Sequence, residues 1–461
     1  MKKIIFLAFA FSGLYAEAQQ SFAGVRESNF AGVYQVTANP AYMGSNKRLW
    51  DVNILSVNGD FNNNSIPLTT DLNKSFNDYT RADQQNAFLK LNDLDAKVNV
   101  DVLGPSFFLR VANSHSVGIF SRMRVLGNVK DINPKLLQSM LYDYNKIDLQ
   151  KPYEIDINNQ EVIANAFSEI GLSWAGELYF SENSVVKAGA SIKIVRGAGN
   201  LYAGFHDFNG TATLRPDPVN QKVYLDINSA GGNFEVLNGG TDFIEDFNAN
   251  KLFRSEATTV GLDLGAIYEW RREGCPTCHN LPYDLRIGVS LMDIGRISYN
   301  ANNESYRYTL PNQQISIDLD ELSQDELTKA IGNRPKGVRG KLKSSLPTTF
   351  NASVDYRIVN GFYANFSSQF NLAGKKSEVY SAVYANEFTL TPRFDSNSFG
   401  AYLPISYNEM SKAHVGLALR LGPLTLGSST LLSNAFGKEA KELNFFVGLR
   451  FGHMSFYNNN D

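Results

Sequence analysis

The feature that most constrains the fold of this chain is an alternation of apolar and polar residues that recurs along most of its length. Segment 443–451, for example, has Leu, Phe, Val, Leu and Phe at its odd positions, with Asn, Phe, Gly and Arg between them. The same period of two is found in segments 186–194, 260–267, 284–291, 350–358 and 415–422. Side chains alternate between the two faces of a β-strand, so each segment is predicted to be a strand with one apolar face.

The length of these alternations distinguishes a membrane barrel from a soluble sheet. Strands of soluble sandwiches usually run for about five or six residues, whereas a tilted strand needs about 9–11 residues to cross a bilayer. The polar faces mix Gly, Ser, Asp, Lys and Arg, which suits a wet or filled lumen with lipid outside. We therefore predict a membrane barrel. A soluble sandwich or a solenoid is the alternative.

The first eighteen residues have the pattern of a signal peptide. Lys2 and Lys3 precede an apolar stretch from Ile4 to Leu14, and Ala16 and Ala18 are the small residues that a signal peptidase reads. The alternative, a membrane anchor, would need about 20 apolar residues. The signal peptide predicts Sec export with cleavage near Ala18, and the barrel pattern then predicts the outer membrane as the location of the chain.

The strand count is even, as in single-chain bacterial barrels. Fourteen strands are predicted, at 49–61, 96–112, 115–127, 161–180, 184–198, 255–272, 283–299, 346–359, 362–372, 378–391, 396–409, 412–422, 423–433 and 442–452. The four longest connections, 62–95, 128–160, 199–254 and 300–345, all fall on one side, while the other side has short turns such as Asn360-Gly361. The sequence thus predicts an all-β transmembrane antiparallel barrel over 49–461 with long extracellular loops.

Residues 19–48 precede the first predicted strand and contain the turn sequence Asn39-Pro40-Ala41. A short Asn-Pro-Ala segment after a signal peptide resembles the FadL-like outer-membrane barrels. It is closer still to their Bacteroidota relatives, the PorV and PorP/SprF-type proteins of type IX secretion and gliding. The resemblance implies fourteen strands and an N-terminal hatch inside the lumen. A lumen of fourteen strands is also too wide for its own side chains to fill. The fatty-acid substrate of the transporter branch is not implied.

The two cysteines form the motif Cys275-Pro276-Thr277-Cys278-His279 in a predicted periplasmic turn. The spacing is that of c-type haem attachment, but the turn is short and no haem-burying fold accompanies it. A disulfide between Cys275 and Cys278 suits an oxidising compartment and is the preferred prediction. Free or metal-bound thiols are the third possibility. We predict no cofactor and no metal site.

The charged residues predicted to face the lumen are of mixed sign. They are Lys187, Lys193, Asp263, Arg286, Asp355, Arg357, Arg420 and Arg450. Opposite charges can pair across a narrow lumen and hold a plug through charged hydrogen bonds, whereas a stripe of one sign would indicate ion selectivity. None of these residues is predicted to be catalytic.

Composition and motifs narrow the function further. The net charge of −3 gives no basic surface for nucleic acid, and no nucleophile motif accompanies the histidines, so we predict that the protein is not an enzyme. Two functions remain. One is a plugged barrel that serves as a structural or partner-binding component of secretion or motility machinery. The other is a gated channel for small hydrophobic or polar solutes. Outer-membrane lipid is the predicted surrounding in both.

Overall fold

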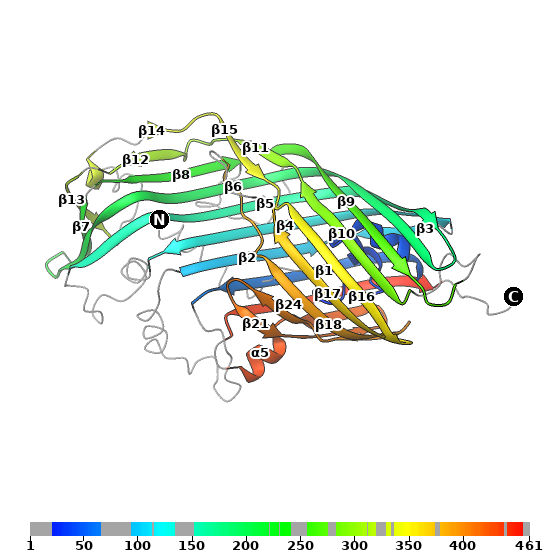
Figure 1. Ribbon diagram of the computed structural model, residues 1–461. Coiled ribbons are helices and arrows are strands. Elements are labelled where there is room, and N and C mark those ends of the chain that lie inside the picture. Colours follow the sequence, from blue (N-terminus) through cyan, green and yellow to red (C-terminus); the bar gives the residue numbers. More distant parts are fainter. Residues whose placement is uncertain are drawn as a thin grey trace.

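The computed structural model describes residues 21–65, 94–112, 115–133, 152–220, 222–229, 231–240, 256–274, 283–310, 312–319, 329–332, 336–373, 379–437 and 440–454. The predicted signal peptide and Cys275 and Cys278 lie outside these ranges, so the predicted cleavage and the predicted disulfide remain predictions. Figure 1 shows a barrel seen from the side, with the N-terminal segment in blue inside one end.

The barrel wall is a closed antiparallel sheet of fourteen passes within the described residues. Its strands are β1 (Arg48–Asn63), β2 (Leu94–Leu103), β3 (Ser106–Ala112), β4 (His115–Ile132), β5 (Tyr153–Phe180), β6 (Ser184–Asp217), β9 (Ala257–Trp270), β10 (Leu285–Ile294), β16 (Thr349–Val359), β17 (Phe362–Asn371), β18 (Glu387–Asp395), β19 (Phe399–Tyr402), β20 (Ile405–Asn408), β21 (Lys412–Val415), β22 (Leu417–Leu421), β23 (Leu424–Ser428) and β24 (Glu442–Met454). The sheet closes where β1 pairs with β24, with Val57 opposite Val447. The predicted fold class is confirmed.

Three of the passes consist of two strands each, and two of them are interrupted at a proline. The pass of β2 and β3 breaks at Gly104-Pro105, and the pass of β19 and β20 breaks at Leu403-Pro404. Proline has no N–H to give to the ladder, so it interrupts pairing at these points. The pass of β21 and β22 breaks at Gly416, where an added Cβ would lie 2.1 Å from the carbonyl oxygen of Ser428.

The outward face of the wall is apolar and the inward face is polar. Val289 and Val447 are each 42% exposed, whereas Asn444 and Arg450 on the inward side of the same strand as Val447 are buried. A continuous outward band of Leu, Ile, Val and Phe is the lipid-facing surface of a transmembrane barrel. No helix among the described residues is long and apolar enough to cross a membrane.

We expect Val447→Arg to lower the free energy of unfolding by about 2–4 kcal/mol, because it places a cation on the lipid-facing surface near the middle of β24. The measurement is urea unfolding in phospholipid vesicles. Val219→Arg is the matched control, since Val219 is 87% exposed at the turn after β6. Equal losses for the two variants would contradict the assignment of the lipid face.

Two of the segments predicted to be long outer loops, 199–254 and 300–345, contain strands of a folded sheet, which corrects that part of the prediction. Most of the other two, 62–95 and 128–160, lies outside the described residues. β5 and β6 run for 28 and 34 residues, and β6 continues past the wall to pair with β7 (Lys222–Ser229) and β8 (Asn233–Gly240). Further strands are β12 (Tyr306–Thr309), β13 (Gln314–Asp318) and β14 (Lys336–Gly337). We call this sheet the outer extension. It lies at the left of Figure 1, at the end opposite the N-terminal segment. It buries its own apolar cluster, which includes Phe208, Leu225 and Phe234.

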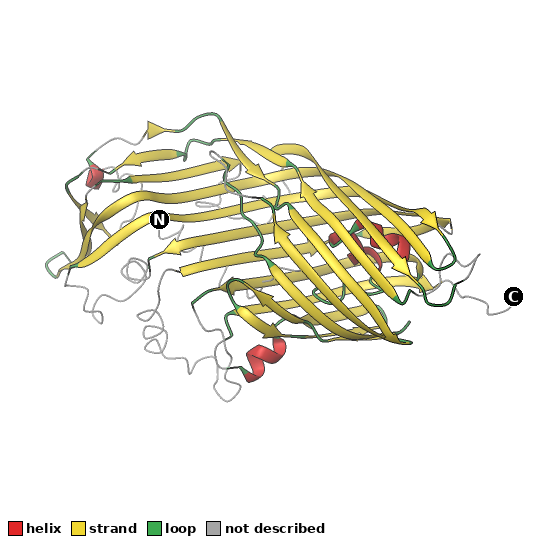
Figure 2. Cartoon of the chain, viewed as in Figure 1, coloured by secondary structure: helices red, strands yellow, loops and turns green. Residues whose placement is uncertain are grey.

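Two predicted strands also leave the wall, because their residues turn into the lumen. The predicted strand 283–299 ends as β10 at Ile294, and the chain turns inward to form β11 (Arg296–Asn300), which pairs with β15 (Lys341–Ser345). In the predicted strand 378–391, residues 379–386 cross the inner face of the wall, and β18 begins only at Glu387. The end of the predicted strand 423–433 is helix α5 (Leu431–Phe436), outside the barrel (Figure 2).

Candidate functional site

The N-terminal segment, residues 21–46, lies inside the barrel and is almost wholly buried. It consists of a series of turns followed by the short 3-10 helices η2 (Gly32–Thr37) and η3 (Pro40–Ser45). Its apolar side chains Phe22, Val33 and Tyr34 form a cluster with the wall residues Phe108 and Phe446. The segment therefore packs as a folded piece of the core and is not a loose leader.

The Asn39-Pro40-Ala41 turn is anchored to the wall by the side chain of Asn39. The Asn39 Oδ1 atom accepts a hydrogen bond from the Ala41 N–H at 2.9 Å, and Pro40 then begins η3 with its φ already suited to a helix. The Asn39 Nδ2 group donates to the carbonyl of Val289 at 3.0 Å. Asparagine supplies both an acceptor and a donor, so one side chain caps the helix and ties it to β10.

Paired glycines on the wall make room for this turn. Gly189 of β6 and Gly265 of β9 face each other across the ladder. A Cβ added at Gly189 would lie 2.4 Å from the Ala41 nitrogen, and one at Gly265 would lie 1.9 Å from Asn39 Oδ1. The backbone of the turn therefore rests directly on the backbone of the wall.

We expect Gly189→Ala to lower the free energy of unfolding by about 1–3 kcal/mol, because the new methyl group collides with backbone atoms of the turn. Gly127→Ala is the matched control on β4, where the nearest atom to the added Cβ would be the Cβ of Val98 at 3.6 Å. Urea unfolding in vesicles measures both. A Gly189→Ala protein as stable as Gly127→Ala would contradict the close packing of the turn.

Three wall arginines, which we call the arginine clamp, hold the segment from different strands. Arg286 lies over the Tyr42 ring at 4.4 Å, Arg420 over Phe30 at 5.1 Å, and Arg450 over Tyr34 at 4.1 Å. A guanidinium over an aromatic ring is attracted by the ring electrons, more strongly where water is excluded.

Two arginines of the clamp, Arg286 and Arg450, and a lysine also donate hydrogen bonds to the main chain of the segment. Arg286 donates to the Glu27 carbonyl at 2.6 Å, and Arg450 donates to the carbonyls of Phe30, at 3.2 Å, and Ala31. Lys187 of β6 donates to the Gly44 carbonyl at 2.9 Å. Because carbonyls are the acceptors, the wall holds the path of the chain as well as its rings.

Two buried carboxylates, those of Asp355 and Asp51, offset the positive charge of Arg286 and Arg450 in the clamp. Asp355 accepts two hydrogen bonds from Arg393, at 2.6 and 2.7 Å, and lies 3.5 Å from Arg286. Asp51 lies 2.9 Å from Arg48 and 3.4 Å from Arg450, and it also accepts the N–H of Val33 at 3.1 Å.

The remaining predicted lumen residues form ion pairs outside the arginine clamp. Lys193 and Asp263 form an ion pair at 2.7 Å nearer the outer end, and Arg357 pairs with Asp284 at 2.7 Å at the periplasmic end, where its side chain is 26% exposed. Sequence reasoning missed Arg393 and Asp51. The alternation of Thr389, Thr391 and Arg393 with apolar neighbours would have indicated Arg393 if the strand had been placed correctly.

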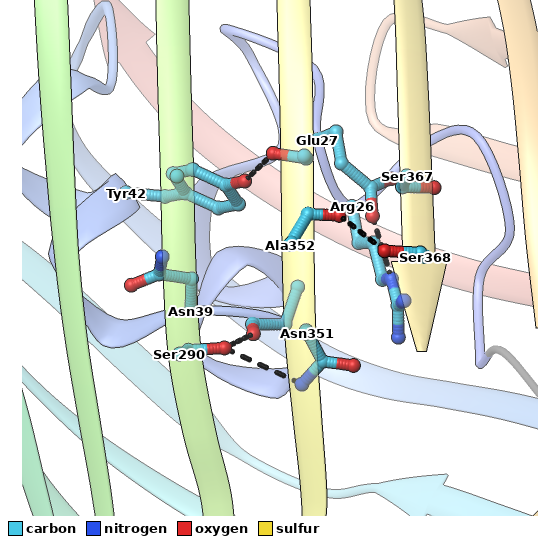
Figure 3. Close-up of a pocket in the computed structure, with 12 residues that line it drawn as sticks. Arg26, Glu27, Asn39, Tyr42, Ser290, Asn351, Ala352, Ser367 and Ser368 are labelled. Carbon is cyan, nitrogen blue, oxygen red and sulfur yellow. Dashed lines mark hydrogen bonds and ion pairs between the residues drawn. The ribbon is translucent and has the colours of Figure 1, made fainter. Parts of the chain in front are cut away.

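A small polar cavity lies between the segment and the strands β10, β16 and β17 (Figure 3). It has about 10 Å³ of space for the centre of a water molecule, which is room for about one water. Ser290 donates to the Ala38 carbonyl at 2.7 Å on one side. Asn351 Oδ1 and Glu27 Oε2 have no hydrogen-bond partner among the described residues. Among these residues, no group of three His, Cys, Asp or Glu side chains is placed to bind a metal.

These features define a transmembrane β-barrel that encloses its own buried N-terminal segment. The model of the family described as "Family of unknown function (DUF5723)" matches residues 40–429, and the chain belongs to this family. The curated proteins gave no match to the sequence.

Solved structures of FadL-type barrels are similar to the chain. A Pseudomonas aeruginosa FadL homologue has 9% identity and a TM-score of 0.43, with 95% of this chain and 99% of that chain covered. The Ralstonia pickettii toluene transporter TbuX has 10% identity and a TM-score of 0.42, with 94% and 99% covered. The P. putida toluene transporter TodX has 10% identity and a TM-score of 0.42, with 92% and 95% covered.

Proposed function

We propose that the protein is a closed outer-membrane barrel that holds a protein partner on its outer side, as a structural component of secretion- or gliding-type machinery. The observation that carries this proposal is the outer extension, a folded sheet with its own apolar core, on a barrel that encloses its N-terminal segment. The link to secretion or gliding rests on the resemblance around Asn39-Pro40-Ala41.

The outer extension has the properties of a stable platform. Arg215 of β6 forms two hydrogen bonds with Asp226 of β7, at 2.7 and 3.2 Å, and a third with Ser316 of β13. Burial would raise the pKa of the Asp226 carboxyl, but the hydrogen bonds from Arg215 and Ser316 outweigh it and hold the pKa below its ordinary value. The carboxylate is thus charged at neutral pH and ties three strands together. Such a sheet is not needed to close the wall, which supports a role in binding.

Site-specific photo-crosslinking in native outer membranes tests the proposal. A photoreactive residue at Val219, at the tip of the outer extension, is expected to give one discrete cross-linked species with a protein partner. The same residue at lipid-facing Val447 is the control and is expected to give lipid adducts only. If Val219 gives no protein adduct and the purified barrel conducts steadily, the partner-binding function is wrong.

A gated channel for small solutes is the second candidate. It is favoured by the polar cavity of Figure 3, which lies between the N-terminal segment and β16 and is lined by several hydroxyl groups. Two polar atoms of its lining residues, Asn351 Oδ1 and Glu27 Oε2, have no partner in the described part of the chain. Water in this cavity would supply those atoms with hydrogen bonds. Solute uptake by vesicles that contain the protein separates the two candidates, because a partner-binding barrel gives no uptake above that of empty vesicles.

A further inference from the structure

A second layer fills the lumen nearer the outer end, separate from the N-terminal segment. Residues 379–386, which we call the strap, cross the inner face of β6, β5, β4 and β2 (Figure 2). The wall holds the strap mainly by its main chain. Asn200 donates to the Tyr380 carbonyl at 2.9 Å, and Asn128 donates to the Val383 carbonyl at 3.0 Å. Asn165 accepts the N–H of Ala382 at 2.6 Å.

The strap is joined to the separate two-stranded sheet of β11 and β15, which we call the inner ribbon. The N–H of Tyr380 donates to the Lys343 carbonyl at 2.9 Å, and the N–H of Ser345 donates to the Ser381 hydroxyl at 2.7 Å. The inner ribbon places Ile297 and Tyr299 against the wall, where both are buried. The strap and the inner ribbon therefore form one unit, which we call the outer layer.

A buried ion network lies beneath the outer layer and is centred on Asp293. Arg124 pairs with Asp293 at 2.6 Å and with Glu169 at 2.8 Å, and Lys193 pairs with Asp293 and Asp263. Arg124 also donates to the Tyr384 hydroxyl of the strap at 3.3 Å. Arg124 and Lys193 are at most 1% exposed, so both cations of this network are buried beneath the outer layer.

Asp293 is also the residue at which the chain leaves the wall. Its φ is +57°, in the left-handed region that Asp and Asn tolerate better than most residues. The register of β9 and β10 shifts between Leu291 and Ile294. The ion pairs of Asp293 therefore hold the turn that directs β11 of the inner ribbon into the lumen.

We propose that the outer layer is a gate that closes the lumen independently of the N-terminal segment, and that Asp293 is its latch. The strap contributes no strand to the wall, so it can leave its amide contacts without breaking a wall ladder. This inference rests on the closed barrel of the proposed function and adds a second barrier to it. Removal of the N-terminal segment alone then leaves the lumen closed.

Labelling of the full-length chain tests the latch. A cysteine at Ala382, which is 1% exposed, is placed in a Cys275→Ser/Cys278→Ser background and treated with a maleimide added from outside. Asp293→Asn keeps the size of the side chain and its tolerance of positive φ. We expect it to raise the labelling rate by about tenfold or more, as for the loss of one charged hydrogen bond. Asp131→Asn is the control, at another aspartate with positive φ whose side chain is 42% exposed, and is expected to leave the rate unchanged. Equal rates in all three proteins would overturn the latch.

Planar-bilayer recording tests the gate. Deletion of residues 19–45 leaves the wall complete from Arg48 onward, and this protein is expected to stay silent. Addition of Asp293→Asn is expected to produce steady openings. A reducible thiol cross-linker between cysteines at Asn165 and Ala382 should abolish those openings, and a reductant should restore them.

The outcomes separate the gate from the proposed function. A wild-type protein that conducts contradicts the closed barrel itself. A silent wild type with a conducting deletion protein overturns only the gate. Openings that the cross-link fails to close overturn the role of the strap, and a folded deletion protein that stays silent with Asp293→Asn overturns the latch.

Discussion

Asp355→Ala is expected to lower the free energy of unfolding by about 3–5 kcal/mol, the range for removal of one partner from a buried ion pair. Asp355 is fully buried and lies between Arg393 and Arg286. Its loss leaves two guanidinium groups in the lumen with one carboxylate fewer, and Arg286 belongs to the arginine clamp. Urea unfolding in phospholipid vesicles measures the change.

The control for this prediction is an ion pair of similar geometry in contact with water. Asp226 pairs with Arg215 at 2.7 Å, and the Arg215 side chain is 50% exposed. Because solvent screens such a pair, Asp226→Ala is expected to cost about 1 kcal/mol or less. Equal small losses for Asp355→Ala and Asp226→Ala would mean that the lumen around Asp355 is hydrated.

The double variant Arg286→Leu/Arg450→Leu is expected to release the N-terminal segment. Each arginine donates charged hydrogen bonds to carbonyls of the segment, worth about 1.5–3 kcal/mol each. The two losses together would raise the exposed population by about 10²–10⁴-fold, at 1.4 kcal/mol per tenfold. The carboxylates they contact keep other partners, since Asp355 retains Arg393 and Asp51 retains Arg48.

Labelling of a cysteine at Ala41 measures this release, again without the native cysteines. Ala41 is 0% exposed, so the wild-type clamp is expected to keep it almost unlabelled. Arg357→Leu serves as the control, because Arg357 pairs with Asp284 at the periplasmic end. Labelling of the double variant that is no faster than that of Arg357→Leu would show that the clamp does not hold the segment.

The wall was predictable from the sequence because alternation follows from one physical demand, lipid on one side and polar contacts on the other. That demand sets the faces of β9, β16 and β24, where the predicted and observed strands overlap almost fully. Segments 199–254 and 300–345 carry a weaker signal, because their strands pair beyond the lipid-facing wall and neither face of that sheet meets lipid.

The interior was predictable only in part. Alternation indicated Arg286, Arg420 and Arg450 as inward residues, but it carries no information on which aromatic ring each one meets. The strap shows how the same signal misleads. Ala382 and Tyr384 are buried and Val383 between them is half-buried, as in a strand, because an extended chain packed on the wall also directs alternate side chains onto it. The strap is bound by asparagine side chains of β4, β5 and β6, which lie far from it in the sequence. No local sequence pattern indicates such contacts.

The most direct test of the central claim is single-channel recording of the mature, full-length protein in planar bilayers. The protein lacking residues 19–45 and carrying Asp293→Asn, inserted by the same procedure, shows that an open form would be detected. With the N-terminal segment clamped and the outer layer latched, we predict no steady conductance above that of the bare bilayer. A steady open channel in the intact protein would contradict the account.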